Sequence, residues 1–501
     1  MTLRTLARGS AIYAAGTLLA RFGGFVLLPI YLALLPPPEY GIIALVTSIV
    51  GFLNIIYRLG LDGALMRLHF DTEPANRPGL YRTLMAVTLA FAALLSLTLG
   101  VVVGPFFDSI FFGVPFVPYG LLALAIAFVG SADYVPTVFY RATQQPGRFV
   151  AFNLGSFAIS SACSIGLVIA GLGSAGALLG QLVGGAIMLV VATVIAVRPG
   201  GRTWLPQAVK PALRFSLPIV PHQVSTWTVR LSDRWLLGLL LVLPTTQQRL
   251  ETIGAYSVGY QLGSLVSMVS TSFNAAWTPY LYRVGDGPRG PRIFRNVLTL
   301  TGAGFAWLAL ALAALAPEIV AVIAADPRYA VAAQVMPIIA FGAACQAAYT
   351  MLVGIVFLRR QTKYLPAITV ASAVANVGLN LLLIPLLGVI GAALTTLVAY
   401  LVFAALTYVF ARRMYPLDVD VRRVLLIVTL TVTGAIIARF LDAPSGDLVR
   451  SGAAHAAIVL VVGAILVALM RRPLAELRSD VAAADVGGEG AVRTSRDTSA
   501  E

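Results

Sequence analysis

The sequence predicts an all-α membrane protein with about fourteen transmembrane helices. Of its 501 residues, 59% are hydrophobic and only 11% are charged, whereas about a quarter of the residues in soluble domains are charged. Apolar stretches recur along the whole chain, and each is long enough to cross a hydrocarbon core of roughly 30 Å. Short loops such as PPPEYG at 36–41 separate neighbouring stretches. The chain is therefore expected to cross a membrane many times.

The predicted spans follow one another with little polar sequence between them. In order they are Ser10–Leu35, Gly41–Arg58, Leu80–Gly104, Phe116–Tyr140, Val150–Gly171, Ala175–Val197, Leu213–Leu243, Ile253–Tyr282, Phe294–Ala316, Ala330–Leu358, Tyr364–Leu386, Val389–Phe410, Val424–Phe440 and Ala453–Met470. The first is too long for the core of a signal peptide, so we interpret it as a span.

The distribution of basic residues predicts the orientation of the chain. Lys and Arg concentrate in the cytoplasmic loops of membrane proteins, and with both termini inside they gather in segments such as 198–214, 283–295 and 412–423. The net charge of +14 therefore reflects topology and attraction to membrane lipids, and nucleic-acid binding is the weaker interpretation. We expect a multi-pass protein of the inner (plasma) membrane with both termini cytoplasmic.

Two regions of the chain resemble each other. FYRATQQPGRF at 139–149 aligns with FLRRQTKYLP at 357–366, and GLGSAGALLGQ at 171–181 aligns with LLGVIGAALTT at 386–396. Spans one to six therefore repeat as spans seven to twelve, in the same orientation because six is even. We predict an N-terminal six-helix lobe at 1–197, a cytoplasmic linker at 198–212, a C-terminal six-helix lobe at 213–411, two additional helices at 412–470 and a disordered cytoplasmic tail at 471–501.

The seventh span, Leu213–Leu243, carries three charges near its middle. At about 100° per residue, Trp227, Arg230 and Arg234 fall within one narrow stripe, and Asp233 flanks it. An intramembrane Arg or Asp costs roughly 2.5–3.5 kcal/mol on insertion scales, so such residues line a cavity or pair inside a bundle. We expect this helix to line a cavity.

Several motifs resemble the oligosaccharide-lipid flippases of polysaccharide biosynthesis, in the multidrug/oligosaccharidyl-lipid/polysaccharide exporter superfamily. They are PPPEYG, GLDGALMRLHF at 60–70, LSDRWLLG at 231–238, IGAYSVGYQL at 253–262 and FNAAWTPYLYR at 273–283. The resemblance implies two six-helix lobes in parallel pseudo-repeat around a central cavity that opens alternately to either side. It also implies a cargo of oligosaccharide linked to undecaprenyl pyrophosphate, carried for O-antigen, capsule or exopolysaccharide synthesis.

Three arginines are the candidates for binding the anionic head of such a cargo. Arg21 lies in span one, and Arg230 and Arg234 lie in span seven. Guanidinium groups match phosphate oxygens bidentately, so physics and the resemblance together predict a pyrophosphate site here. The alternative is that Arg230 and Asp233 pair to bind helices together. For the sugars we name Trp227 and Tyr260, although such aromatic residues are also enriched at membrane interfaces without a ligand.

Two acidic residues are candidates for coupling transport to an ion. Asp133, in span four, has no basic residue within a turn of its own helix, so it could bind a proton or a sodium ion; the alternative is a pair with Arg21. Asp233 is the second candidate. Transport could then be driven by a proton gradient, a sodium gradient or the membrane potential.

The sequence contains no signature of an enzyme, and no phosphate-binding GxxxxGK[ST] motif occurs. We therefore expect neither cofactor nor metal, and a monomer whose partners are lipid-linked oligosaccharide and membrane lipids, with a polymerase and glycosyltransferases as further candidate partners. A multidrug or cation antiporter could use the same scaffold, but an acidic cavity would suit cationic drugs better. A membrane-embedded polymerase or ligase would need catalytic carboxylates or a large external loop.

Overall fold

The computed structural model describes residues 19, 22–197, 204–324, 326–441 and 448–497, with side chains through Val481. Every regular element in these ranges is a helix. By length and composition, ten helices in the described chain can cross a membrane, and Phe22–Leu34 is a shorter apolar helix. Each predicted span overlaps a described helix. The prediction of an all-α, multi-pass membrane protein is therefore confirmed.

The chain packs as two compact units. Unit 1 comprises Met1–Gly259, Val320–Ala332 and Thr369–Thr395, and unit 2 comprises Tyr260–Ile319, Ala333–Ile368 and Thr396–Glu501. These limits differ from those of the lobes expected at 1–197 and 213–411, because the units follow packing whereas the lobes follow the sequence repeat. The helix that contains the charged stripe, for example, packs against the second span within unit 1. The division into lobes stays a prediction.

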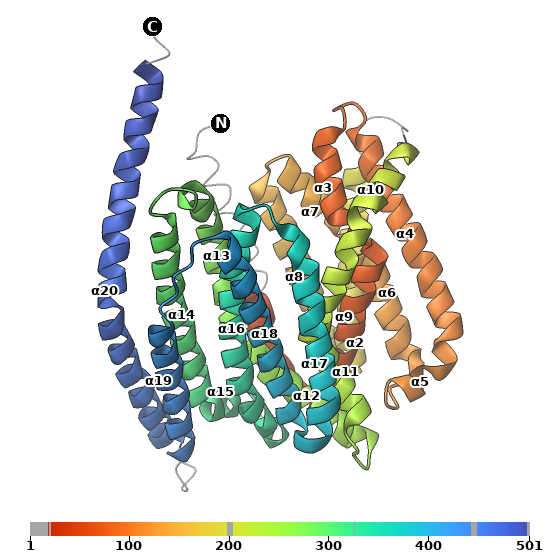
Figure 1. The fold of residues 1–501 in the computed structure, drawn as a ribbon. Coiled ribbons are helices and arrows are strands. Elements are labelled where there is room, and N and C mark those ends of the chain that lie inside the picture. Colours follow the sequence, from red (N-terminus) through yellow and green to blue (C-terminus); the bar gives the residue numbers. More distant parts are fainter. Residues whose placement is uncertain (1–18, 20–21, 198–203, 325, 442–447, 498–501) are drawn as a thin grey trace. The chain divides into compact units, whose positions relative to one another are not determined.

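Unit 1 holds the helices of the first half of the chain and one later helix (Figure 1). They are α2 (Pro37–Arg58), α3 (Leu61–Asp71), α4 (Arg77–Val102), α5 (Phe107–Ile110), α6 (Leu121–Gly130), α7 (Tyr134–Ala142), α8 (Pro146–Leu167), α9 (Gly173–Val197), α10 (Val209–Ser216), α11 (Val220–Leu240), most of α12 (Thr246–Gly263) and most of α17 (Leu365–Leu387). The predicted loop between α8 and α9 is a tight turn, in which Gly171 and Gly173 have φ values of +89° and +54°. Only glycine adopts such values without strain.

Unit 2 holds the remaining helices. They are α13 (Leu265–Val284), α14 (Gly290–Ala314), half of α15 (Ala316–Ile323), most of α16 (Ala332–Leu358), most of α18 (Val389–Met414), α19 (Val421–Phe440) and α20 (Leu448–Asp497). The single span predicted over Ile253–Tyr282 is thus divided into α12 and α13. Helices α14, α19 and α20 pack side by side (Figure 1). Large apolar side chains such as Leu425 and Ile436 of α19 remain exposed, which suits a surface in contact with lipid.

Two glycines of unit 1 let α2 and α12 touch through their backbones. A methyl group added at Gly41 would overlap the carbonyl of Leu250, and one added at Gly254 would overlap the carbonyl of Pro37. Both glycines come from motifs named above, PPPEYG and IGAYSVGYQL. The two motifs therefore meet at one helix crossing.

The C-terminal segment differs from the disordered tail expected at 471–501, because α20 continues as a helix to Asp497 (Figure 1). The helical part of the segment, 471–497, contains five Ala and five Arg residues, which favour helix. It is also held to α14 by ion pairs between Arg295 and Glu476, at 3.2 Å, and between Arg292 and Asp480, at 3.3 Å. Gly and charge content predicted disorder, whereas helix propensity and these pairs favour the helix.

Candidate functional site

Helix α11 carries the polar stripe through unit 1, and its hydroxyl groups are satisfied within the helix itself. Thr226, Thr228 and Ser232 each donate to the carbonyl four residues earlier, at 2.9, 3.0 and 2.6 Å. Such bonds remove the penalty of a bare hydroxyl in an apolar medium. The charged side chains are therefore the groups that need another explanation.

Asp233 and Arg234 form a buried ion pair. Arg234 Nη1 donates to Asp233 Oδ1 at 3.1 Å, and the Arg234 backbone N–H donates to the same oxygen at 3.0 Å. The hydroxyl of Tyr256, from α12, donates to Asp233 Oδ2, and the Arg234 guanidinium lies 5.9 Å from the Tyr256 ring centre. Asp233 is 1% exposed and Arg234 is 6% exposed. The two charges neutralise each other inside unit 1.

This geometry corrects the alternative pairing considered for Asp233, whose partner is Arg234 rather than Arg230. The side chain of Arg230 is exposed, and no ion pair joins it to a carboxylate of the described residues. Its backbone carbonyl accepts a hydrogen bond from Arg234 Nη1 at 3.1 Å. Of the two arginines in the stripe, Arg230 presents its charge outward and Arg234 is enclosed.

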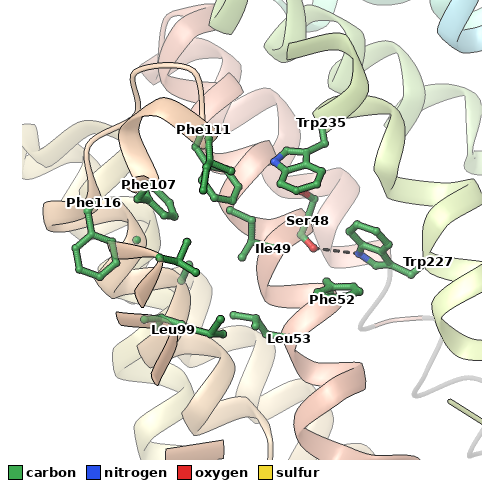
Figure 2. A pocket seen from close by; sticks show the side chains of 15 residues that line it. Ser48, Ile49, Phe52, Leu53, Leu99, Phe107, Phe111, Phe116, Trp227 and Trp235 are labelled. Atoms are coloured by element: carbon green, nitrogen blue, oxygen red, sulfur yellow. Dashed lines mark hydrogen bonds between the residues drawn. The ribbon is translucent and has the colours of Figure 1, made fainter. Parts of the chain in front are cut away.

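Trp227 lies between this charged region and an apolar cavity. Its indole Nε1–H donates to the backbone carbonyl of Ser48 in α2 at 3.0 Å, and its ring lies 5.0 Å from that of Phe52 (Figure 2). The cavity has a volume of about 420 Å³ and lies within unit 1, with walls from α2, α4, α5, α6 and α11. Sequence reasoning placed Trp227 on the polar stripe, but it could not find the cavity, which long-range packing creates.

Tyr260 belongs to unit 2, whereas the other described candidates belong to unit 1. Its hydroxyl lies 3.3 Å from that of Tyr400 in α18, and the side chain is buried. This contact gives Tyr260 a packing role, and sugar binding by it stays a prediction. Arg21 lies outside the described residues.

Asp133 stands between α6 and α7 and has a partner that the sequence did not suggest. Its Oδ2 lies 3.9 Å from Nη2 of Arg58, at the end of α2. The alternative pair with Arg21 lies outside the described residues and stays a prediction. Arg58 also donates to the Gly130 carbonyl. Three buried polar atoms here, Asp133 Oδ1, Arg58 Nε and Asn54 Oδ1, have no hydrogen-bond partner among the described residues.

A second polar network, in unit 1, links α17 to α18. Asn380 Nδ2 donates to Asn376 Oδ1 at 3.2 Å, and Thr395 Oγ1 donates to Asn380 Oδ1 at 2.7 Å. All three side chains are fully buried. The spacing of the two asparagines, four residues apart on one helix, is the sequence signal for such a network.

The fold and these sites define a multi-pass helical membrane protein with a buried ion pair in one of its helices. Within that class, the chain belongs to the polysaccharide biosynthesis protein family, whose model matches residues 32–327. No curated protein sequence matches the chain significantly.

Solved structures share the fold over most of the chain. The lipid II flippase MurJ, in an inward closed conformation, is 14% identical with a TM-score of 0.70, over 92% of this chain and 99% of that one. A MATE transporter in a straight conformation is 15% identical with a TM-score of 0.57, over 82% and 95%. A MATE transporter of Vibrio cholerae is 14% identical with a TM-score of 0.56, over 82% and 97%. The resemblance to the exporter superfamily is thus confirmed at the level of the fold.

Proposed function

We propose that the protein is a transporter that flips undecaprenyl-pyrophosphate-linked oligosaccharide across the inner membrane by alternating access. The transported units would serve the synthesis of a cell-surface polysaccharide, such as O-antigen, capsule or exopolysaccharide. Membership of the polysaccharide biosynthesis protein family supports this cargo, and the fold shared with MurJ supports a flipping mechanism. Glycosyltransferases would act on the same cargo before this step, and a polymerase would act on it afterwards.

The observation that carries the proposal is the exposed guanidinium of Arg230 on the polar face of α11, without a carboxylate partner among the described residues. An intramembrane cation is unfavourable unless water or an anion meets it, and a pyrophosphate is an anion that guanidinium binds bidentately. In this scheme Arg234 has a supporting role. It pairs with Asp233 and donates to the Arg230 carbonyl, so it stabilises the helix turn that carries Arg230. Arg21 would add a second cation from span one.

The test is transport of lipid-linked oligosaccharide by purified protein in proteoliposomes. We expect Arg230→Gln to reduce the flipping rate at least about tenfold while thermal stability stays at the parental value, because the exposed side chain contributes little packing. Arg230→Lys should restore only part of the rate, since an ammonium lacks the two-pronged geometry. Arg67→Gln, which removes an exposed arginine of α3 paired with Asp71, is the matched control and should flip normally.

Equal flipping by the Arg230→Gln variant and the parent would remove the pyrophosphate site from α11. Drug efflux without flipping would instead support the antiporter alternative. The ion that drives transport is assigned by the same assay, with proton, sodium and voltage gradients imposed one at a time.

A further inference from the structure

The aromatic cavity of unit 1 has a continuous wall of rings (Figure 2). Phe116 meets Phe107 edge to face at 5.5 Å, Phe107 stacks on Phe111 at 4.2 Å, and Phe111 meets Trp235 at 5.6 Å. These contacts join the segment between α4 and α6 to helix α11. The wall therefore holds the cavity open with large, rigid side chains that have little rotamer freedom to collapse into it.

Two polar groups at the edge of the cavity, Ser48 and the Trp227 indole, are already hydrogen-bonded. Ser48 Oγ donates to the Leu45 carbonyl at 2.7 Å, and the Ser48 carbonyl accepts from Trp227 Nε1 at 3.0 Å. The remaining lining consists of apolar and aromatic side chains such as Ile49, Leu99 and Phe116. A cavity of this kind gives water few partners and binds apolar molecules instead. Its volume of about 420 Å³ suits part of one hydrocarbon chain, in the range of ordinary ligand pockets.

Trp227 connects this cavity to the cation of α11. Arg230 follows Trp227 by three residues, so the two side chains emerge about 60° apart around the helix and one turn apart along it. A molecule whose apolar chain passes Trp227 into the cavity can therefore place an anionic group beside Arg230. The ligand that fits both features is an amphiphile with an anionic head and a long hydrocarbon chain.

We propose that the cavity binds the polyprenyl chain of the transported lipid, with the phosphate head at Arg230. This inference rests on the proposed function and adds a site for the part of the cargo that an arginine cannot recognise. It assigns Phe107, Phe111 and Trp235 to the chain and Trp227 to the junction between chain and head.

The experiment uses the full-length protein in lipid nanodiscs and an undecaprenyl phosphate that carries a photoreactive diazirine on its chain. After irradiation, mass spectrometry should map the label to α4, α6 or α11 at the cavity wall. Unlabelled undecaprenyl phosphate should abolish labelling, whereas an equal amount of phosphatidylglycerol should not. Competition by phosphatidylglycerol at equal strength would show that an ordinary membrane acyl chain fills the cavity, and would overturn the proposal.

A filling variant and its control test the same site by substitution. Leu99→Trp puts an indole into the cavity, and Leu97→Trp puts one on the exposed side of the same helix, where Leu97 is 68% exposed. We expect Leu99→Trp to weaken labelling at least about tenfold, or about 1.4 kcal/mol, and Leu97→Trp to leave it unchanged. Equal labelling of both variants would refute the site.

The labelling and flipping assays distinguish failure of the proposed lipid site from failure of the proposed transport function. If Leu99→Trp does not yield folded protein, the position of the label in the parent protein is the test of the site. A label that maps outside the cavity then overturns the proposal. Flipping without cavity labelling would refute this site and leave the transport function intact. Cavity labelling without flipping would refute the transport function and leave the lipid site intact.

Discussion

The buried pair of Asp233 and Arg234 predicts a large and asymmetric response to substitution. Asp233→Asn removes the charged partner of Arg234, which is only 6% exposed, and disturbs the bond from Tyr256. Breaking a buried pair from one side costs about 3–5 kcal/mol, because the remaining charge stays in the apolar interior. We therefore expect Asp233→Asn to lower the free energy of unfolding by about that amount.

Arg234→Gln should be milder, because Asp233 keeps two hydrogen bonds, from Tyr256 and from the backbone N–H of residue 234. We expect a loss of about 2–3 kcal/mol, near the value of one charge-assisted hydrogen bond. The double variant Asp233→Leu with Arg234→Met removes both charges together and should be more stable than Asp233→Asn, since an apolar pair of similar volume replaces a buried ion pair at little cost.

The assay is denaturant unfolding of purified protein in detergent micelles, followed by tryptophan fluorescence. Thr228→Val is the matched control on the same helix, because among the described residues the Thr228 hydroxyl bonds only the Val224 carbonyl, and its loss should cost about 1 kcal/mol or less. If Asp233→Asn unfolds within about 1 kcal/mol of the parent, the pair does not stabilise unit 1 and the reasoning from burial fails.

Two further predictions concern the helix crossing and the polar cluster at Asp133. Gly254→Ala should destabilise the protein by about 1–3 kcal/mol, because its methyl group overlaps the Pro37 carbonyl. Gly302→Ala, with nothing within 4 Å of the added atom, should instead stabilise α14 by about 0.5–1 kcal/mol. Thermal unfolding compares the two variants, and equal melting temperatures would contradict the close contact. Asp133→Asn should leave flipping insensitive to imposed proton or sodium gradients in proteoliposomes, and a variant that responds to both gradients like the parent would exclude Asp133 from coupling.

Much of the fold follows from local sequence, since hydropathy alone places a helix in every predicted span. The exceptions lie where composition and packing disagree. Ile253–Tyr282 carries no charged residue yet is divided between α12 and α13. Residues 471–497 are polar yet helical, and pairs such as Arg295 with Glu476 hold the start of this segment to α14. The hydrophobic periodicity of the sequence does not predict such contacts between helices.

The candidate site was predictable as a set of residues but not as a set of partners. The stripe on α11 identified Arg230, Asp233 and Arg234, but successive residues point about 100° apart on a helix, so the stripe does not indicate a pair between Asp233 and Arg234. A long arginine side chain can reach back across that angle. The partner of Asp133 comes from Arg58, two spans earlier in the chain, and the sequence offers no signal for that choice without the topology.

The crossing of α2 and α12 has a mechanical consequence. Most helix pairs interlock through side chains, so a change in their crossing angle requires many side chains to disengage. At Gly41 and Gly254 the backbones touch directly, and there are no side chains to disengage at the point of contact. The crossing therefore fixes the separation of the two helices while leaving their angle comparatively free, as a pivot does.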